Sequence, residues 1–448
     1  MKGQDIGRSR GRITRGRRDL AAHRLTDKQH QRRPQFLACR STHSEWLELL
    51  VAPAEVVLEH AAESLGHGRD FFGDGCADPA IGQLTEPSEL EIEVARTQHP
   101  QPSTHYPWDV RVLELVGFDG PASLQPGERP EPAPGPGEVR VRLRTMALNH
   151  LDVFITRGLP KRPLPAILGS DGAGVVDAVG GGVENVRVGD EVILYPIVAC
   201  GTCDACRLGQ EVHCPKMAIL GEHVDGTFQE LLVVPADICH PKPAHLSFEE
   251  TAALPLAWLT AWRLLFTRGH LQAGDWVVLV GIGGGVATAC LLLGKAHGLH
   301  VIATSRDEHK RQHALQLGAD AAIPSEGFSK AAQAATGGAG ARAVVDTVGP
   351  ATLDQSIRSL AREGMLLTVG ATSGPRVELL LPRMWFRHLA LITSTMGNHS
   401  EFRHMLADVN THQLRPPVDR VFPLAEGDQA FAHLEAGAQF GKVVLSAP

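Results

Sequence analysis

The chain has 448 residues, of which 43% are apolar and 21% are charged, and its formal net charge is -7. These values fit a globular protein of two or three domains. The modest negative charge argues against a protein that contacts nucleic acid over its whole surface. No run of about 18 apolar residues is present, so we expect no membrane-spanning segment.

Residues 1–107 are the least regular part of the sequence. They show little sustained hydrophobic periodicity apart from a helical candidate at Ser44–Leu65, and their first forty residues are rich in arginine. We expect either a disordered extension or the product of an upstream start codon, with the working chain beginning near Val110. A basic arm that binds nucleic acid or a partner is the alternative. Because this segment lacks the apolar core of a secretory signal, the expected compartment is the cytoplasm.

Short strands dominate the sequence from residue 108 to 243. Val110–Leu115 and Glu138–Arg144 alternate apolar and charged side chains, as half-buried strands do. Proline and glycine residues interrupt the stretch between them. Three further strands are predicted, at Val175–Val179, Glu191–Leu194 and Leu231–Val234.

Strands and helices alternate from residue 244 to 398. The apolar run Trp276–Val280 is followed by a glycine-rich turn and a helix at Val286–His297. Strand His300–Thr304 is followed by a helix at Glu308–Leu317. This alternation is typical of an α/β fold with a doubly wound parallel sheet. Three further strands are predicted, at Ala343–Asp346, Met365–Val369 and Ala390–Ser394.

A glycine-rich loop joins the first of these strands to its helix. Glycines let the backbone turn tightly and approach a pyrophosphate, while free N–H groups at the helix start bind it. We therefore predict that the loop binds a dinucleotide, and a sheet that has lost its nucleotide is the alternative. The loop residues are Gly281, Gly283, Gly284, Gly285 and Val286.

The end of the second strand indicates which nicotinamide cofactor binds. Folds that bind NAD usually carry an acidic residue there, which holds the ribose hydroxyls. Here the strand leads into Ser305 and Arg306, with Lys310 close by. Because these cations would accept a 2′-phosphate, we expect NADP(H) rather than NAD(H). Arg306 could instead only solvate the start of the next helix.

Four of the eight cysteines lie within fifteen residues, at a spacing suited to metal ligation. In a reducing compartment such a cluster favours a metal over disulfides. Four thiolates fill the tetrahedral shell of zinc and leave no position for water, so we expect one structural zinc per chain. The predicted ligands are Cys200, Cys203, Cys206 and Cys214.

Several motifs, taken in chain order, resemble those of the medium-chain dehydrogenase/reductase superfamily, which includes zinc alcohol dehydrogenases and quinone oxidoreductases. The resemblance covers about Val110 to Val444. Besides the glycine loop and the four cysteines, it rests on Ala147–Asp152, Gly169–Gly174 and Gln439–Val444, of which the second is predicted to be a turn.

This resemblance implies a domain organisation. A GroES-like, β-rich catalytic domain is expected over 108–243, with a Rossmann domain that binds NADP inserted over 244–398. The chain is then expected to return to the catalytic domain over 399–448, and the active site is expected in the cleft between the two domains. The resemblance also implies a homodimer, formed through the edge strand near Ala390–Ser394.

The sequence departs from the family where its alcohol dehydrogenases hold a catalytic zinc. The two cysteine positions fall on Asn149 and near Leu256, and the histidine position falls on Ser170. The position of the proton-relay hydroxyl falls on Leu151. We therefore expect no catalytic zinc of the usual kind. The segment from Asn149 to Asp152 resembles the zinc-free quinone and enone reductases instead.

Without that zinc, polar side chains must position the substrate and stabilise a developing oxyanion or supply a proton. The candidates are Asn149, His150, Asp171 and His223. Asn149 could instead hold a turn, Asp171 could pair with a basic side chain, and the two histidines could be ordinary packed or solvated residues. A relocated metal site made by His150, Asp171 and His223 is a further alternative.

The expected function is hydride transfer between NAD(P)H and a small-molecule carbonyl, quinone or activated alkene. A loop after a predicted strand is expected to meet the nicotinamide, and it contains Gly370, Ala371 and Thr372. The alternatives are a zinc alcohol dehydrogenase with altered ligands, a cofactor-binding regulator without turnover, and a zinc ribbon that binds nucleic acid. We expect no nucleic-acid partner.

Overall fold

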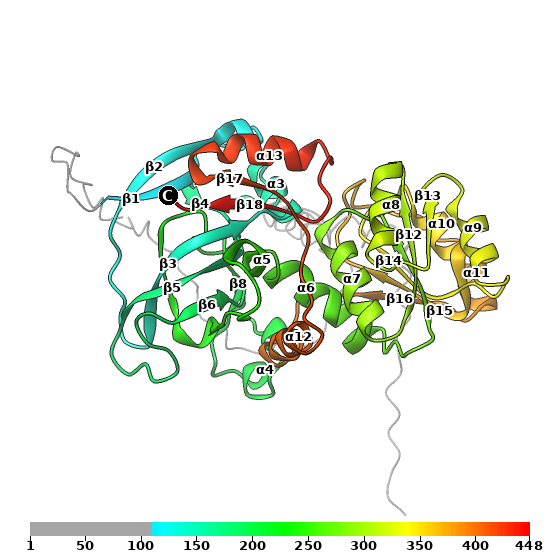
Figure 1. Cartoon of the computed structure of the whole chain (residues 1–448), viewed down its shortest axis with the longest axis horizontal. Helices are drawn as coiled ribbons and strands as arrows, with labels where there is room; N and C mark the ends of the chain where they lie inside the picture. The colour runs from blue at the N-terminus through cyan, green and yellow to red at the C-terminus, as the bar shows by residue number, and fades with distance from the viewer. Residues whose placement is uncertain (1–108) are drawn as a thin grey trace, which may run out of the picture. The chain divides into compact units, whose positions relative to one another are not determined.

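The computed structural model describes residues 109–448, and Figure 1 labels their helices and strands. The predicted extension 1–107, with its helical candidate Ser44–Leu65, lies outside these described residues. Within residues 109–448, no helix combines the length and the apolar character that crossing a membrane requires.

A seven-stranded sheet forms the centre of the β-rich part, in the order β10-β6-β5-β3-β18-β17, with β9 also paired to β3. Every second residue of β3 is buried over its first half, as its apolar and charged alternation predicts. The strands are β3 (Glu138–Ala147), β5 (Asp171–Val179), β6 (Glu191–Leu194), β9 (Leu231–Pro235), β10 (Cys239–Pro241), β17 (Val418–Pro423) and β18 (Lys442–Ser446).

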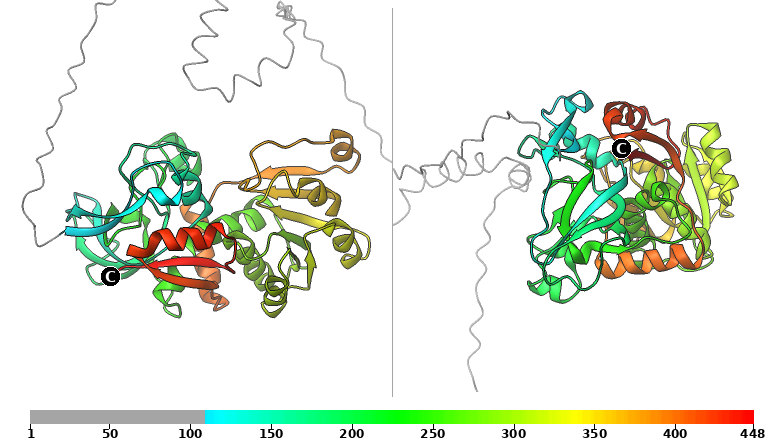
Figure 2. Two further views of the ribbon diagram at one scale, coloured as in Figure 1. Left: turned by 90° about the horizontal axis from the view of Figure 1, so that it is seen from above. Right: turned by 60° about the vertical axis from the view of Figure 1, so that its left-hand side comes forward.

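The last strands of the chain pair with its first ones. β18 runs antiparallel to β3, with Val444 opposite Ala147. Figure 2 shows the C-terminal segment, in red, beside the first strands, in cyan. This pairing brings Lys442 close to the segment that follows Ala147, although almost three hundred residues separate them in the sequence. A three-stranded sheet accompanies them, made by β1 (Asp109–Leu115), β2 (Leu124–Pro130) and β4 (Ala166–Ile167).

Short helices and one small hairpin connect these strands. They are η1 (Pro121–Ser123), α3 (His150–Thr156), β7 (Ile197–Val198), α4 (Asp204–Arg207), η2 (Glu211–His213), β8 (Ala218–Ile219), η3 (Ala236–Ile238) and α5 (Phe248–Ala252). Longer helical segments follow, namely α6 (Pro255–Trp262) and the π-helical η4 (Arg263–Arg268). Near the end of the chain lie α12 (His399–Thr411), η5 (Leu424–Glu426) and α13 (Gly427–Glu435).

A six-stranded sheet with the order β13-β12-β11-β14-β15-β16 forms the α/β part, and all of its pairs are parallel. The order reverses beside β11, where doubly wound sheets bind ligands beyond the strand ends. The strands are β11 (Trp276–Val280), β12 (His300–Ser305), β13 (Ala321–Pro324), β14 (Ala341–Asp346), β15 (Leu360–Thr368) and β16 (Ala390–Thr393). Its helices are α7 (Gly285–Ala296), α8 (Glu308–Gln316), α9 (Phe328–Ala335), α10 (Leu353–Ser359) and α11 (Leu381–Phe386).

The predicted parallel sheet is confirmed, and most predicted strands agree with the structure within a few residues. The turn predicted at Gly169–Gly174 is wrong beyond its first two residues, because β5 begins at Asp171. A side chain at Gly174 would place its Cβ 2.3 Å from the carbonyl oxygen of Arg142 on β3. The glycine therefore permits close approach of two strands rather than a turn.

Candidate functional site

A cavity of about 1010 Å³ lies where the carboxyl ends of the parallel strands face the β-rich part. Residues from the glycine loop, the end of β12, the loop after β15 and the start of α3 all line it. A cavity of this size matches those that bind cofactors and substrates. The cavity therefore unites segments that the sequence suggested separately.

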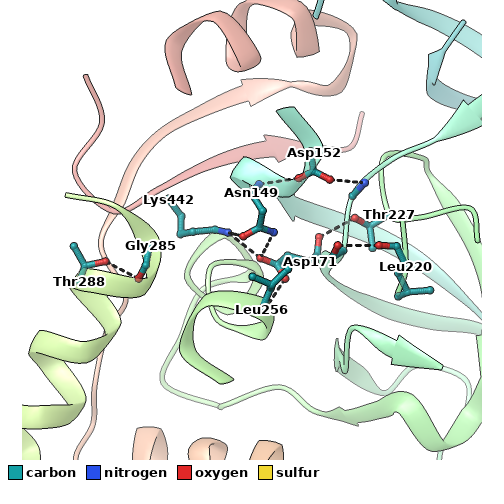
Figure 3. Close-up of polar contacts among 11 residues, drawn as sticks. Asn149, Asp152, Asp171, Leu220, Thr227, Leu256, Gly285, Thr288 and Lys442 are labelled. Carbon is teal, nitrogen blue, oxygen red and sulfur yellow. Dashed lines mark hydrogen bonds and ion pairs between the residues drawn. The ribbon is translucent and has the colours of Figure 1, made fainter. Parts of the chain in front are cut away.

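A buried network of three side chains lies beside the cavity (Figure 3), and two of them, Asn149 and Lys442, line it. The Lys442 ammonium donates to Asn149 Oδ1 at 2.6 Å and to Asp171 Oδ2 at 2.9 Å. Asn149 Nδ2 donates to the same Asp171 oxygen at 3.0 Å. The side chains of Lys442 and Asp171 are only 5% and 0% exposed, so the ion pair is shielded from water. We call Asn149, Asp171 and Lys442 the lysine network.

The lysine network lies among the three positions where the family's alcohol dehydrogenases bind catalytic zinc. Asn149 belongs to the network, and the backbone N–H of Leu256 donates to Asp171 Oδ1 at 2.8 Å. Buried Ser170 donates its hydroxyl to the carbonyl oxygen of Leu220 at 2.8 Å. An amide, a hydroxyl and an aliphatic side chain do not form the ligand set of a zinc site. These residues therefore do not fit the family's catalytic zinc.

Lys442 is the functional residue that sequence reasoning missed. Lys442 lies within the motif Gln439–Val444, which carries part of the family resemblance but from which no role for the lysine was predicted. It precedes the apolar run Val443–Leu445, and a lysine there is buried only when a partner compensates its charge. That position was the available clue, whereas the identity of the partners depends on the pairing of β18 with β3. The hypothesis that Asp171 pairs with a basic side chain is confirmed.

An ammonium group has three N–H donors, and the lysine network uses two of them. Lys442 also lines the cavity, and its Cδ lies 3.0 Å from the position that a Cβ on Gly285 would occupy. The Lys442 side chain therefore passes the start of α7 and ends at Asn149 and Asp171. From there it can stabilise an anion, whether a cofactor phosphate or a substrate oxygen.

His150 lines the same cavity at the first position of α3. Its side chain is accessible within the cavity, yet protein surrounds it on several sides. Burial, followed by the charge of Lys442, lowers the pKa of His150 below its ordinary value of 6.5. The imidazole is therefore neutral at pH 7, so it can donate or accept one hydrogen bond without adding positive charge.

Asp152 holds the backbone beside Asn149 in place. It is fully buried, and its carboxylate accepts the backbone N–H of Asn149 at 2.7 Å and that of Gly169 at 3.1 Å. These bonds fix the start of α3 against the turn before β5. Burial nevertheless raises the pKa of Asp152 to about 7. The prediction that this segment holds a backbone turn agrees with these contacts.

His223 is not among the residues that line the cavity, whereas its neighbour Glu222 is. Its Nδ1 accepts the backbone N–H of Ile219 at 3.2 Å, and its ring is 45% exposed. Among the described residues, no group of three potential metal ligands includes His150, Asp171 or His223. The structure thus brings Asn149 and His150 to the cavity and places Asp171 behind Asn149, but leaves His223 apart from them.

The glycine loop has the backbone conformation that its sequence predicts. Gly281 and Gly283 adopt φ values of 78° and 112°, which favour glycine. Gly281, Gly284, Gly285 and Val286 line the cavity, and α7 begins at Gly285 with its free N–H groups. Gly283 lies outside the lining, and its carbonyl instead accepts the backbone N–H of Gly441 at 2.9 Å. This bond ties the loop to the segment before Lys442, and the contact of Gly283 with a cofactor stays a prediction.

Ser305, Arg306 and Lys310 all line the cavity beyond the end of β12. Burial lowers the pKa of Lys310, whose ammonium donates to the carbonyl oxygen of Gly437 at 2.6 Å. The nearest acidic residue, Asp307, caps α8 by accepting the backbone N–H groups of His309 and Lys310. Its Oδ1 is therefore engaged by the start of α8.

The loop after β15 contributes to the same cavity. Gly370 and Thr372 line it, together with Ser373, whereas Ala371 does not. Two of the three residues expected to meet the nicotinamide, Gly370 and Thr372, therefore face the cavity, and their contact with the cofactor stays a prediction. The Ser373 hydroxyl donates to the carbonyl oxygen of Val348 at 2.7 Å, which ties this loop to the one after β14.

The four predicted zinc ligands converge in a lobe around α4. Their sulfurs all lie within 4.8 Å of one another, with separations of 3.5 to 3.9 Å between neighbouring pairs. A tetrahedron with Zn–S bonds of about 2.3 Å places its sulfurs about 3.8 Å apart. Backbone N–H groups also reach the sulfurs, and those of Thr202 and Cys203 lower the pKa of Cys200. The lobe formed by Cys200, Cys203, Cys206 and Cys214 therefore fits zinc, and we call it the cysteine lobe.

Comparisons with known proteins place both halves of the described chain. Residues 135–244 match the alcohol dehydrogenase GroES-like domain, and residues 285–411 match the zinc-binding dehydrogenase family. A zinc-type alcohol dehydrogenase-like protein of Schizosaccharomyces pombe is 36% identical over 351 residues, which are 74% of this chain and 96% of that protein.

Two further similarities bear on chemistry. An acryloyl-coenzyme A reductase of Metallosphaera sedula is 29% identical over 305 residues, which are 68% of this chain and 90% of that protein. A crystal structure of an NAD-dependent alcohol dehydrogenase has 41% sequence identity and a TM-score of 0.74. That match covers 75% of this chain and 100% of the other.

Proposed function

Since the chain belongs to the zinc-type, medium-chain alcohol dehydrogenase-like family, we propose that it is an NADPH-dependent reductase with one structural zinc. Its substrate is a small molecule that carries a carbonyl, a quinone or an activated alkene. The β-rich GroES-like part and the Rossmann-like parallel sheet provide the framework for this activity.

The observation that carries the proposal is the lysine network. Next to Asn149, on which the family's first zinc-ligand position falls, this chain places the ammonium of Lys442, which also contacts Asp171. A fixed positive charge in a shielded site stabilises negative charge that develops on a substrate oxygen. The carboxylate of Asp171 keeps the cation in position, and the amide of Asn149 completes the arrangement.

When bound, the nicotinamide supplies the hydride, and the protein provides orientation and electrostatic stabilisation. Lys442 directs its remaining N–H toward the cavity and stabilises an alkoxide or enolate oxygen. His150 lies at the cavity wall as a neutral imidazole, which can pass its N–H proton to the product while its other ring nitrogen takes a proton from water. Neither role requires a metal ligand in the cavity.

Reduction of activated alkenes and of carbonyls makes the same electrostatic demand, because both build charge on an oxygen. The relatives include proteins named acryloyl-coenzyme A reductase and proteins named alcohol dehydrogenase. A spectrophotometric screen of NADPH oxidation over aldehydes, quinones and enones tests the proposal. We expect turnover with at least one class, in enzyme that retains a single tightly bound zinc. Cofactor binding without oxidation across the whole panel would favour a regulator instead.

The preference for NADPH is supported by Arg306 and Lys310 beside the cavity and by the capping role of Asp307. One structural neighbour is named NAD-dependent, so the preference is a property proposed for this chain itself. Charge-assisted hydrogen bonds contribute about 1.5–3 kcal/mol. Arg306→Ala should therefore raise the KM for NADPH at least about tenfold and leave that for NADH unchanged. Lys330→Ala, at an exposed residue of α9, is the matched control. A wild-type preference for NADH would contradict the assignment.

We also propose a homodimer through β16, the outer strand of the parallel sheet. Apolar side chains beside this edge are exposed, with Phe386 at 70%, Trp385 at 55% and Leu391 at 42%. An unpaired, apolar edge strand favours association with a second strand. The mass in solution, measured by light scattering, distinguishes the dimer from a monomer.

A further inference from the structure

A second cluster of metal-ligating side chains lies outside the cavity. His297 follows the last residue of α7, while Asp408 and His412 lie four residues apart at the end of α12. One ligand atom from each of the three lies within 4.8 Å of the other two. Residues four apart on a helix share one face, so α12 directs its two ligands toward His297. None of the three lines the cavity.

Neighbouring side chains already orient two of these ligands. The indole Nε1 of Trp262 donates to Asp408 Oδ2 at 2.8 Å, and His297 Nε2 lies 2.9 Å from the same oxygen. The ring of Phe266 packs against His297 with centroids 4.4 Å apart, which restricts the imidazole. A carboxylate held by a second donor is the usual support of a metal ligand. An ion inserted between His297 Nε2 and this oxygen would leave the hydrogen bond from the indole in place.

We propose that His297, Asp408 and His412 form a second zinc site, which is exchangeable and lies at the surface. Two imidazoles and one carboxylate are ligands that zinc accepts, with water at the fourth position. Tetrahedral zinc with bonds of about 2.0–2.1 Å separates its ligand atoms by about 3.3 Å. The contact between His297 and Asp408 therefore opens by a few tenths of an ångström, and the exposed His412 side chain completes the set.

The proposed site joins two helices that are distant in the sequence. α7 follows the glycine loop, whereas α12 lies in the segment that leads back to β17 and β18. An ion held by both helices binds only the folded chain, so it raises the folding stability. With three ligands and partial exposure, the site holds zinc less tightly than the four thiolates of the cysteine lobe.

Calorimetric titration with ZnCl₂ of the full chain, purified with its tightly bound zinc, tests the site. We expect the wild-type protein to bind one further equivalent and to gain thermal stability on doing so. His412→Ala and Asp408→Asn should both lose the further equivalent and the gain in Tm. His309→Ala is the matched control, because His309 is an exposed histidine of another helix, α8, and lies outside the cluster. It should keep both properties.

Two results would overturn the proposal. One is a wild-type chain that binds no zinc beyond that of the cysteine lobe. The other is a further equivalent that persists in both His412→Ala and Asp408→Asn, which would place the ion elsewhere. The activity measured by NADPH oxidation should be the same in His412→Ala as in the wild type. The proposed surface zinc site is therefore tested independently of the proposed reductase function.

Discussion

The cysteine lobe and the lysine network are both built to hold a positive charge, but they do so by different means. In the lobe, four thiols within fifteen residues surround a place for an ion that must be supplied from solution. In the network, the cation is covalently part of the chain, and a buried carboxylate and an amide surround it. The cysteine lobe is partly exposed, whereas the three residues of the lysine network are buried.

This difference separates two properties that a zinc enzyme usually combines. Removal of an ion from the lobe should affect folding, because the thiolates lose the centre that draws them together. Removal of the charge at Lys442 should affect chemistry, because the cavity loses its fixed cation. We therefore expect stability and turnover to depend on different cations in this protein, so that variants can change one at a time.

The largest expected effect comes from the cysteine lobe. Cys214→Ser should abolish tight zinc binding and lower Tm strongly, since structural zinc contributes about 10–16 kcal/mol of binding free energy in small peptides. Zinc content by atomic absorption and Tm by calorimetry measure both changes. Cys290→Ala alters a cysteine buried inside α7 and should keep its zinc. If Cys214→Ser stayed as stable as the wild type, the lobe would have no structural role.

The next largest effect concerns turnover. Lys442→Met should lower kcat/KM by about 10²–10³, which is the usual cost of removing one stabilising donor. The unpaired Asp171 should also cost about 3–5 kcal/mol of stability. The double variant Lys442→Met with Asp171→Asn should regain stability but not turnover. Comparison of kcat/KM and Tm in the two variants separates these effects.

A matched pair outside the cavity provides the control for Lys442. Lys295 contacts Asp320 at 2.6 Å, but both side chains are 28% exposed, so the pair is worth about 0–1 kcal/mol. Lys295→Met should leave kcat/KM unchanged. A double variant of Lys442 and Asp171 with wild-type turnover would show that the network only supports the fold.

The smallest effect is a dependence of stability on pH. Burial raises the pKa of Asp152 from 3.8 to about 7, so between these values the folded chain holds a proton that the unfolded chain releases. The stabilisation that this bound proton gives to the folded chain is present in full below about pH 4 and is lost as the pH rises to about 7. Asp152→Asn should therefore show a smaller fall in Tm between pH 5 and pH 8. Glu128→Gln, at an exposed carboxyl group, should keep the wild-type dependence.

The same contrast explains how far the sequence could be interpreted. The ligands of the cysteine lobe follow one another along the chain, so their spacing alone predicted the site. Five of the six parallel strands were predicted because each is a local apolar run, whereas the short β13 (Ala321–Pro324) was not predicted. The lysine network depends on β18 pairing with β3, a contact between distant segments that no local pattern encodes. For the same reason the turn predicted at Gly169–Gly174 was wrong from Asp171 onward, since the neighbour that requires glycine at Gly174 lies on another strand, β3.

The zinc content and the rate of turnover, measured on the same sample, test most directly whether the chain reduces its substrate without a zinc ion in the cavity. The His412→Ala chain, which lacks the proposed surface site, would be dialysed against a weak chelator and assayed for zinc per chain and for NADPH oxidation. We expect this chain to retain one zinc and full activity, and to keep that zinc when Asp171→Asn is added. A second zinc, lost together with activity and dependent on Asp171, would contradict this expectation.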